Sequence, residues 1–401
     1  IQYAVLECGI NLLDTSPWYG HGMSECVVGY AMDTILISND IPAMNSSQEE
    51  TLLAGENRIK RSDITINTKI GRYSSEPKEM FDFSSERVRQ STLQSISRMR
   101  CEYIDVLQLH DPEFSPSFEL LINETIPEMA RLRDEDGLVK AIGMTGYPLE
   151  VQAYLIDAAY KRHGILFDTS LVYCHYNLHD QSLFKKALKV PHMAPQERIA
   201  SSSLKKLAPY DDTFNSDNYT SYANFLESMD TKLLAAAPLS MGLLTSDGPP
   251  SWHPASNELK IACRHVEHIC AEHNVNFAAL AMLFALNNDR VACTVIGMKD
   301  RIQVDKAMEI ASRYIPRNTT VEEESGYMKD FRSSSAVQSC QSMFLPDELK
   351  VIGIINGSKN GPFSDLTKQN MNEWNGLAEA RKFWSNIPIS HQFADSLTKI
   401  D

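Results

Sequence analysis

The stretch that decides the fold is Gly9-Ile-Asn-Leu-Leu-Asp-Thr-Ser-Pro-Trp-Tyr-Gly-His-Gly-Met-Ser-Glu25. Its apolar residues, Ile10 to Leu13, predict a short buried strand that ends on the carboxylate of Asp14. A tight turn then carries the phenol of Tyr19, five residues after that carboxylate. Acids and phenols placed just after the carboxyl end of a strand are typical of active sites in α/β proteins. This stretch therefore predicts a strand-and-helix unit together with a candidate site.

The same unit recurs along the chain, as short apolar runs that lead through a polar turn into a helical pattern. Further strands are predicted at 64–68, 104–109, 139–144, 168–173, 233–237 and 292–296, with helices at 85–99, 120–133, 150–161 and 258–271. Strands that are apolar on both faces and alternate with helices indicate a parallel sheet. No GxGxxG motif follows an early strand, which disfavours a doubly wound sheet.

The strand count favours a barrel. Seven predicted strands follow a helix-like stretch at residues 1–8, and a helix in this rhythm needs a strand before it. Restoring that strand gives the eight units of a (β/α)8 TIM barrel. We therefore predict an α/β protein with this fold, whose first strand is lacking at the N-terminus of the chain.

Three segments depart from this rhythm. Residues 34–60 and 180–230 are longer than a barrel connection needs, and loops of that length are usually functional or disordered. Residues 313–401 mix Ser-rich and Gly-rich stretches with one aromatic helix, predicted at 372–384. We predict a barrel over residues 1–312 with insertions at about 34–60 and 180–230. Residues 313–401 are predicted to form a C-terminal extension that packs on the barrel and is partly disordered.

Composition limits the partners of the chain. Its 401 residues are 43% hydrophobic, which is enough for one large core or for two smaller ones. A formal net charge of −14 disfavours nucleic acid or an anionic membrane as the main partner. No apolar run approaches the ~20 residues that span a bilayer, and the eight cysteines contain no CxxC pair. We expect a cytoplasmic protein that binds neither nucleic acid nor membrane, and we favour a monomer.

Polar residues end the first three predicted strands. Asp14 ends the first, with Tyr19 in the loop after it, Lys69 ends the second and His110 ends the third. Because barrel active sites lie at the carboxyl ends of the strands, we expect these four side chains to meet there. Lys69 should lower the pKa of the Tyr19 phenol, and Asp14 should hold Lys69 charged. Each residue alone also fits a helix cap, a surface charge or core packing, but the four in this order indicate a site.

These residues resemble the aldo-keto reductase family. The matching motifs are Leu-Asp14-Thr-Ser-Pro-Trp-Tyr19-Gly, Asn-Thr-Lys69-Ile-Gly-Arg-Tyr and Ile-Asp-Val-Leu-Gln-Leu-His110-Asp. The resemblance runs from residue 1 to about residue 310. It implies an NAD(P)-dependent oxidoreductase in which Asp14, Tyr19, Lys69 and His110 form the catalytic tetrad, with Tyr19 as the general acid or base.

Three further stretches, at 142–149, 173–177 and 236–245, are similar to the sugar-dehydrogenase branch that includes L-galactose dehydrogenase. This similarity implies oxidation of the anomeric carbon of an aldose, such as L-galactose, to a lactone. The tetrad does not fix the direction of reaction, so an aldehyde, ketone or pyridoxal reductase that uses NADPH is the alternative. A catalytically inactive regulatory barrel is a third reading.

The resemblance also implies contacts with a nicotinamide cofactor, NAD or NADP. Thr145 and Gly146 match the positions that contact the nicotinamide amide. Pro238, Leu239 and Ser240 match the positions that line the pyrophosphate. The cofactor is therefore expected to lie across the mouth of the barrel, with a small sugar or aldehyde as substrate.

A loop after the last predicted strand supplies further cofactor candidates: Gly297, Lys299, Arg301 and Gln303. The loop opens a helix, and helix N-termini bind phosphate well. Lys299 or Arg301 would either meet the 2′-phosphate of NADP or be solvated loop charges, and the nearby acids Asp300 and Asp305 leave the choice between NAD and NADP open.

No metal site is predicted. Five potential ligands lie close together in the sequence: Cys263, His265, His268, Cys270 and His273. In the predicted helix the two cysteines and the first two histidines point to different faces, so an ordinary amphipathic helix explains them better.

Overall fold

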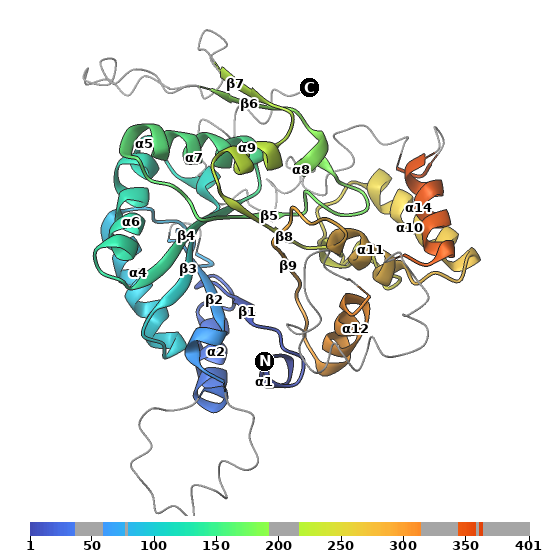
Figure 1. The fold of residues 1–401 in the computed structure, drawn as a ribbon, viewed down its shortest axis with the longest axis horizontal. Helices are drawn as coiled ribbons and strands as arrows, with labels where there is room; N and C mark the ends of the chain where they lie inside the picture. Colours follow the sequence, from blue (N-terminus) through green and yellow to red (C-terminus); the bar gives the residue numbers. More distant parts are fainter. Residues whose placement is uncertain (37–58, 77–78, 192–215, 314–343, 358–360, 364–401) are drawn as a thin grey trace, which may run out of the picture.

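The computed structural model describes residues 1–36, 59–76, 79–191, 216–313, 344–357 and 361–363. Within these residues, seven parallel strands form one sheet in the order β1-β2-β3-β4-β5-β8-β9. The sheet curls into a nearly closed barrel with helices on its outside (Figure 1), which confirms the predicted (β/α)8 type of fold. The strands are β1 (Leu12–Asp14), β2 (Thr65–Ile70), β3 (Ile104–His110), β4 (Val139–Gly146), β5 (Thr169–Tyr173), β8 (Lys232–Ala236) and β9 (Cys293–Val295).

Helices follow the strands as the sequence pattern predicted. The hydroxyl of Ser84 starts α4 by accepting from the Arg87 amide at 3.3 Å. Gly164, in the left-handed region at φ 68°, ends α7. The principal outer helices are α2 (Met23–Ile35), α4 (Ser85–Met99), α6 (Ile126–Asp134), α7 (Leu149–His163), α9 (Tyr222–Ser228), α10 (Asn257–Glu272), α11 (Phe277–Leu286) and α12 (Arg301–Ala311).

The main core lies between the sheet and its helices. Alternate strand residues point outward into this layer, and Ile66, Leu107 and Ile142 are completely buried there. The other alternate residues face the barrel interior, where Lys69 is paired in register with Gln108. This alternation is what places the polar strand residues inside the barrel, away from the apolar core.

The first and last parts of the barrel meet through their helices. The short α1 (Gln2–Leu6) packs against α12. There the Tyr3 hydroxyl donates to Asp305, and the Arg301 guanidinium lies 3.8 Å from the centre of the Tyr3 ring. Ala4, Cys8 and Val304 form a small apolar cluster beneath this contact.

The predicted insertion at 180–230 is more than an irregular connection, because parts of it form helices and strands. They include α8 (Ser182–Lys185), an antiparallel pair formed by β6 (Leu188–Pro191) and β7 (Ser216–Tyr219), and the barrel helix α9. The end of α2 overlaps the start of the predicted insertion at 34–60. Residues 37–58 of this insertion lie outside the described residues.

The described part of residues 313–401 includes α14 (Pro346–Gly357). Val351 and Ile355 of α14 are buried in a second apolar cluster with α10 and α11. The helix predicted at 372–384 lies outside the described residues.

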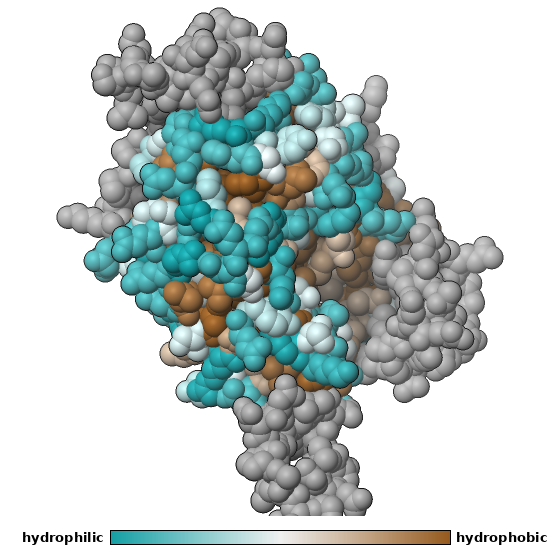
Figure 2. Space-filling view, turned by 60° about the vertical axis from the view of Figure 1, so that its left-hand side comes forward, coloured by the Kyte–Doolittle hydropathy of each residue, from teal (hydrophilic) through white to brown (hydrophobic). Residues whose placement is uncertain are grey.

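In the described part of the chain, no single helix is long and apolar enough to cross a membrane. The α10–α11 pair has the length and composition for a span only when joined across a 104° bend. The face of the molecule in Figure 2 is largely hydrophilic, with separate apolar patches between the polar side chains.

Candidate active site

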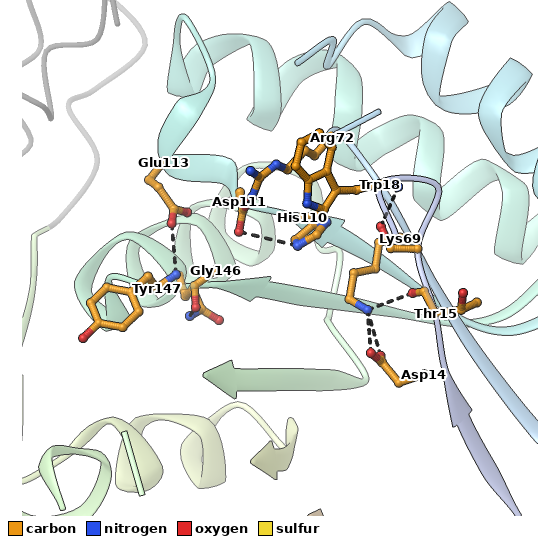
Figure 3. Close-up of polar contacts among 12 residues, drawn as sticks. Asp14, Thr15, Trp18, Lys69, Arg72, His110, Asp111, Glu113, Gly146 and Tyr147 are labelled. Atoms are coloured by element: carbon orange, nitrogen blue, oxygen red, sulfur yellow. Dashed lines mark hydrogen bonds and ion pairs between the residues drawn. The ribbon is translucent and has the colours of Figure 1, made fainter. Parts of the chain in front are cut away.

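A buried ion pair lies at the carboxyl ends of β1 and β2. The Lys69 ammonium donates to both carboxylate oxygens of Asp14 and to the Thr15 carbonyl, each at 2.8 Å (Figure 3). Asn67, the register partner of Asp14 on β2, donates to Asp14 Oδ1 at 2.6 Å. Desolvation is the largest single effect and lowers the pKa of Lys69, but the charges and hydrogen bonds of Asp14 and Tyr19 together outweigh it, so the net pKa is raised. Lys69 is therefore held charged inside the barrel, as the sequence predicted.

Tyr19 lies over this pair, in the loop between β1 and α2. Its ring centre is 4.7 Å from Lys69 Nζ and 6.3 Å from the His110 ring, to which it is nearly perpendicular. Although 38% of the residue is exposed, desolvation of the phenol has the largest effect and raises the pKa of Tyr19 above its ordinary 10.0. The charge of Lys69 lowers the pKa of Tyr19, as predicted, but this effect is smaller than that of desolvation. The prediction of a net lowered pKa for Tyr19 is therefore wrong, because burial dominates.

His110 ends β3 and faces the same interior. Burial lowers the pKa of His110 to about 4, aided by the nearby charges of Lys69 and Arg72 and opposed by Asp111. The imidazole is therefore neutral near pH 7. Among the described residues, its Nδ1 is buried and has no hydrogen-bond partner. The structure thus brings Asp14, Tyr19, Lys69 and His110 together as the sequence predicted.

The structure adds an ion pair that the sequence argument missed. The Arg72 guanidinium donates to Asp111 Oδ2 at 2.7 Å and stacks 4.1 Å from the centre of a Trp18 ring. Asp111 Oδ1 lies 3.6 Å from His110 Nε2. The sequence did contain a signal for this pair, because Arg72 follows Lys69 closely and Asp111 follows His110 directly, each at the end of a strand. Asp111 also stands at the end of the quoted His110 motif.

Glu113, in the short helix η2 (Pro112–Phe114), is a second acidic residue near the site that the sequence pattern did not predict. Its Oε1 accepts from the Tyr147 amide at 3.0 Å, while its Oε2 is buried without a hydrogen-bond partner in the described part of the chain. Burial, and then the charge of Asp111, raise the pKa of Glu113 to about 8. The carboxyl is therefore mostly protonated near neutral pH.

The predicted nicotinamide contacts lie beside the tetrad. Thr145 is paired in register with His110, and its carbonyl accepts from the Asp111 amide at 2.8 Å. Gly146 lies against Glu113, because a Cβ added to Gly146 would stand 2.6 Å from Glu113 Oε2. Thr145 thus lies beside His110, and the Glu113 carboxyl fills the space that a side chain at Gly146 would occupy.

The loop after β8 contains the residues predicted to line the pyrophosphate. Near Pro238 and Leu239 the backbone is unusual, since Ala237 and Ser240 have φ values of 60° and 45°. Such conformations cluster at functional sites. Ser240, however, is completely buried, and its hydroxyl contacts Asn177 Nδ2 at 3.0 Å and His179 Nε2 at 2.7 Å. Its side chain is engaged within the protein, so the structure gives no support for its predicted contact with a cofactor.

The loop before α12 is organised by its own hydrogen bonds. Asp300 caps the helix by accepting from the Gln303 amide at 2.9 Å, and the Gln303 side chain accepts from the Lys299 amide at 2.9 Å. Arg301 stacks on Tyr3, as described above. The space around Gly297 is open, since a Cβ there would meet nothing within 4 Å.

A nicotinamide group fits the polar groups at the mouth of the barrel. In the register row of Lys69, the buried Gln108 amide and Thr169 hydroxyl have no hydrogen-bond partner among the described residues, and neither has His110 Nδ1. A carboxamide both donates and accepts hydrogen bonds, which suits such a set of unpaired donors and acceptors.

The described residues contain no group of three or more His, Cys, Asp or Glu side chains that could hold a metal ion. In α10, Cys263 and Cys270 point into the core, whereas His265 and His268 are exposed. These side chains therefore lie on different faces, as the helical pattern predicted.

Comparison with known proteins agrees with this geometry. The family model described as "Aldo/keto reductase family" matches residues 1–317. The chain is 34% identical to L-galactose dehydrogenase from Arabidopsis thaliana over 298 residues, which cover 74% of this chain and 72% of the relative. It is 27% identical to D-arabinose 1-dehydrogenase from Saccharomyces cerevisiae over 289 residues, 72% of this chain and 68% of that one.

A third relative, D-threo-aldose 1-dehydrogenase from a Pseudomonas species, is 24% identical over 323 residues, with 78% of this chain and 84% of that one covered. Among solved structures, an aldo-keto reductase from Bacillus halodurans in its holo form superposes with a TM-score of 0.50 at 21% identity. That superposition covers 82% of this chain and 85% of the other, and it shows a shared fold. The chain belongs to the aldo/keto reductase family and is an NAD(P)-dependent oxidoreductase.

Proposed function

We propose that this enzyme oxidises the anomeric carbon of an aldose, such as L-galactose, to a lactone. The observation that carries the proposal is the charged Lys69–Asp14 pair beneath the Tyr19 ring, beside a neutral His110. An aldose substrate is supported by the three relatives described above, each of which is named as a sugar dehydrogenase.

In this reaction Tyr19 takes the proton of the anomeric hydroxyl. The base is the Tyr19 phenolate, which desolvation alone would disfavour and the Lys69 ammonium stabilises, and it becomes the neutral phenol when it takes the proton. The neutral His110 donates from Nε2 to the reacting oxygen and so fixes its position. The nicotinamide, when bound, supplies the acceptor for the hydride that leaves the anomeric carbon. In the reverse direction Tyr19 returns its proton to a carbonyl oxygen.

For the cofactor we propose that NAD is preferred over NADP. The Asp300 carboxylate already caps the N-terminus of α12, where a 2′-phosphate would otherwise be bound. Arg301, the nearest candidate for pairing with that phosphate, stacks on Tyr3 beside Asp305. The negative charge of Asp300 and this engagement of Arg301 both disfavour a second phosphate.

Steady-state assays of cofactor reduction, with a panel of aldoses and with either NAD or NADP, test the proposal. We expect oxidation of at least one aldose, with the higher kcat/KM for NAD. Tyr19→Phe should lower kcat by about 10²- to 10⁴-fold and leave cofactor binding, measured by fluorescence titration, unchanged. Tyr160→Phe, at an exposed tyrosine of α7, is the matched control and should match the wild type.

Retention of more than about a tenth of the activity by Tyr19→Phe would contradict the role of Tyr19. Reduction of aldehydes without oxidation of any aldose would favour the reductase alternative. That alternative has support from a relative named as the NADH-specific methylglyoxal reductase of Escherichia coli, 24% identical over 193 residues.

A further inference from the structure

Asp111 is held rigidly at the mouth of the barrel, directly after His110. Its backbone lies in the left-handed region, at φ 52° and ψ 52°, which aspartate tolerates better than most residues. Its amide donates to the Thr145 carbonyl at 2.8 Å and so ties the loop after β3 to the end of β4. The backbone from which the carboxylate projects is therefore fixed by the sheet.

The two oxygens of the Asp111 carboxylate face different groups. Oδ2 accepts from Arg72, whose guanidinium is fixed in turn by stacking on Trp18. Oδ1 faces His110 Nε2 at 3.6 Å, which is too long for a hydrogen bond. The side chain is 15% exposed, so the carboxylate is reachable from the mouth although it is paired.

This arrangement places an acceptor beside the proposed reacting oxygen. An oxygen held by His110 Nε2 lies next to Asp111 Oδ1, because both face the same imidazole nitrogen (Figure 3). In a cyclic aldose the ring oxygen shares the anomeric carbon but cannot donate a hydrogen bond, so the nearest donor to the reacting oxygen is the hydroxyl on the adjoining carbon. A hydroxyl donates readily to a carboxylate, and such charge-assisted bonds are among the stronger hydrogen bonds.

We propose that Asp111 is a specificity-determining residue that accepts a hydrogen bond from the substrate hydroxyl adjoining the reacting carbon. It would thereby select α-hydroxylated substrates, such as aldoses, over simple aldehydes and deoxy sugars. Arg72 positions the carboxylate and balances its charge. This inference rests on the proposed aldose dehydrogenase function.

The size of the selection follows from the chemistry. A site built to bond a substrate hydroxyl disfavours the analogue that lacks it, because the acceptor is left without its partner. One hydrogen bond to a charged acceptor corresponds to about 10- to 100-fold in kcat/KM.

The test compares each oxidised aldose with its 2-deoxy counterpart in the wild type and in Asp111→Asn. We expect the wild type to prefer the aldose by about 10- to 100-fold in kcat/KM, and Asp111→Asn to reduce this ratio to near one. Dividing the wild-type preference by the preference of Asp111→Asn cancels the intrinsic difference in reactivity between the two sugars, because this difference is the same for both proteins. A general loss of activity would lower both values equally and leave the ratio unchanged.

Asp105→Asn is the matched control. Asp105 lies near the other end of β3 and is paired with Arg61 at 2.6 Å, so its loss also removes an Asp–Arg pair. The control should keep the wild-type preference for the aldose. Should Asp111→Asn fail to fold, the wild-type ratio still decides, because equal use of the two sugars would overturn the inference.

The outcomes separate the two proposals. If the wild type oxidises aldose and 2-deoxyaldose equally, or if Asp111→Asn lowers both equally, the inference fails and the proposed function stands. In that case the Arg72–Asp111 pair only supports the loop. If no aldose is oxidised with either cofactor, both the proposed function and this inference are overturned.

Discussion

Lys69 Nζ donates to both carboxylate oxygens of Asp14 at 2.8 Å, with only 2% of the lysine side chain and 10% of the aspartate side chain exposed. The remaining donor of the ammonium reaches the Thr15 carbonyl. Burial of two charges is favourable only when each is fully paired, and this geometry meets that condition. The pair therefore contributes to the integrity of the barrel as well as to the proposed chemistry.

The first prediction concerns this pair. Asp14→Asn should destabilise the protein by about 3–5 kcal/mol, because it leaves the Lys69 charge buried without its partner. The double variant with Lys69→Met should recover part of that loss, since no charge is then left unpaired. Urea unfolding measures both. Asp33→Asn, which removes the exposed Arg100–Asp33 pair, is the control and should cost less than about 1 kcal/mol. Additive effects of the two site substitutions would contradict this account.

The second prediction follows from the neutral state of His110. Burial lowers its pKa from 6.5 to about 4, so between these values the unfolded chain binds a proton that the folded protein does not. The free energy of unfolding should therefore fall as the pH is lowered through this window, by at most about 3 kcal/mol from this group. His110→Gln should flatten the dependence, measured by urea unfolding at each pH. The exposed His268 serves as a control, because His268→Gln should leave the slope as it is.

Glu113 gives a dependence of opposite sign. Burial raises its pKa from 4.5 to about 8, so the folded protein retains a proton that the unfolded chain loses. Its contribution to stability is fully present below about pH 4.5 and is lost as the pH rises towards 8. Glu113→Gln, which keeps a neutral group of the same shape, should therefore be more stable than the wild type near pH 8. The exposed Glu86→Gln should show no such gain, and an equal gain in both variants would refute the assignment.

A steric prediction tests the contact between Gly146 and Glu113. A Cβ added to Gly146 would lie 2.6 Å from Glu113 Oε2 and 3.0 Å from Pro112 Cδ. Gly146→Ala should thus cost about 1–3 kcal/mol of stability, and Glu113→Ala in the same chain should relieve part of that cost. Gly353→Ala, where a Cβ meets nothing within 4 Å, should be neutral or slightly stabilising. An unchanged cost in the double variant would show that the strain lies elsewhere.

Much of the fold is determined by local sequence. Apolar runs and helical periodicity placed every strand of the barrel sheet, and the helix predicted at 85–99 coincides with α4. The barrel also explains why a sequence pattern revealed the tetrad. Parallel strands end at the same rim, so Asp14, Lys69 and His110 meet there although they are far apart in the chain. Residue type and strand position were enough for that step.

What the tertiary structure alone decided is the environment of each group. The net pKa of Tyr19, the engagement of Ser240 by Asn177 and His179, and the stacking of Arg301 on Tyr3 all depend on residues distant in sequence. Desolvation and hydrogen-bond geometry arise only when those residues pack together, so no local pattern encodes them. For the same reason, the sequence shows Asp111 and Glu113 close to His110, but only the folded barrel shows how they relate to the site.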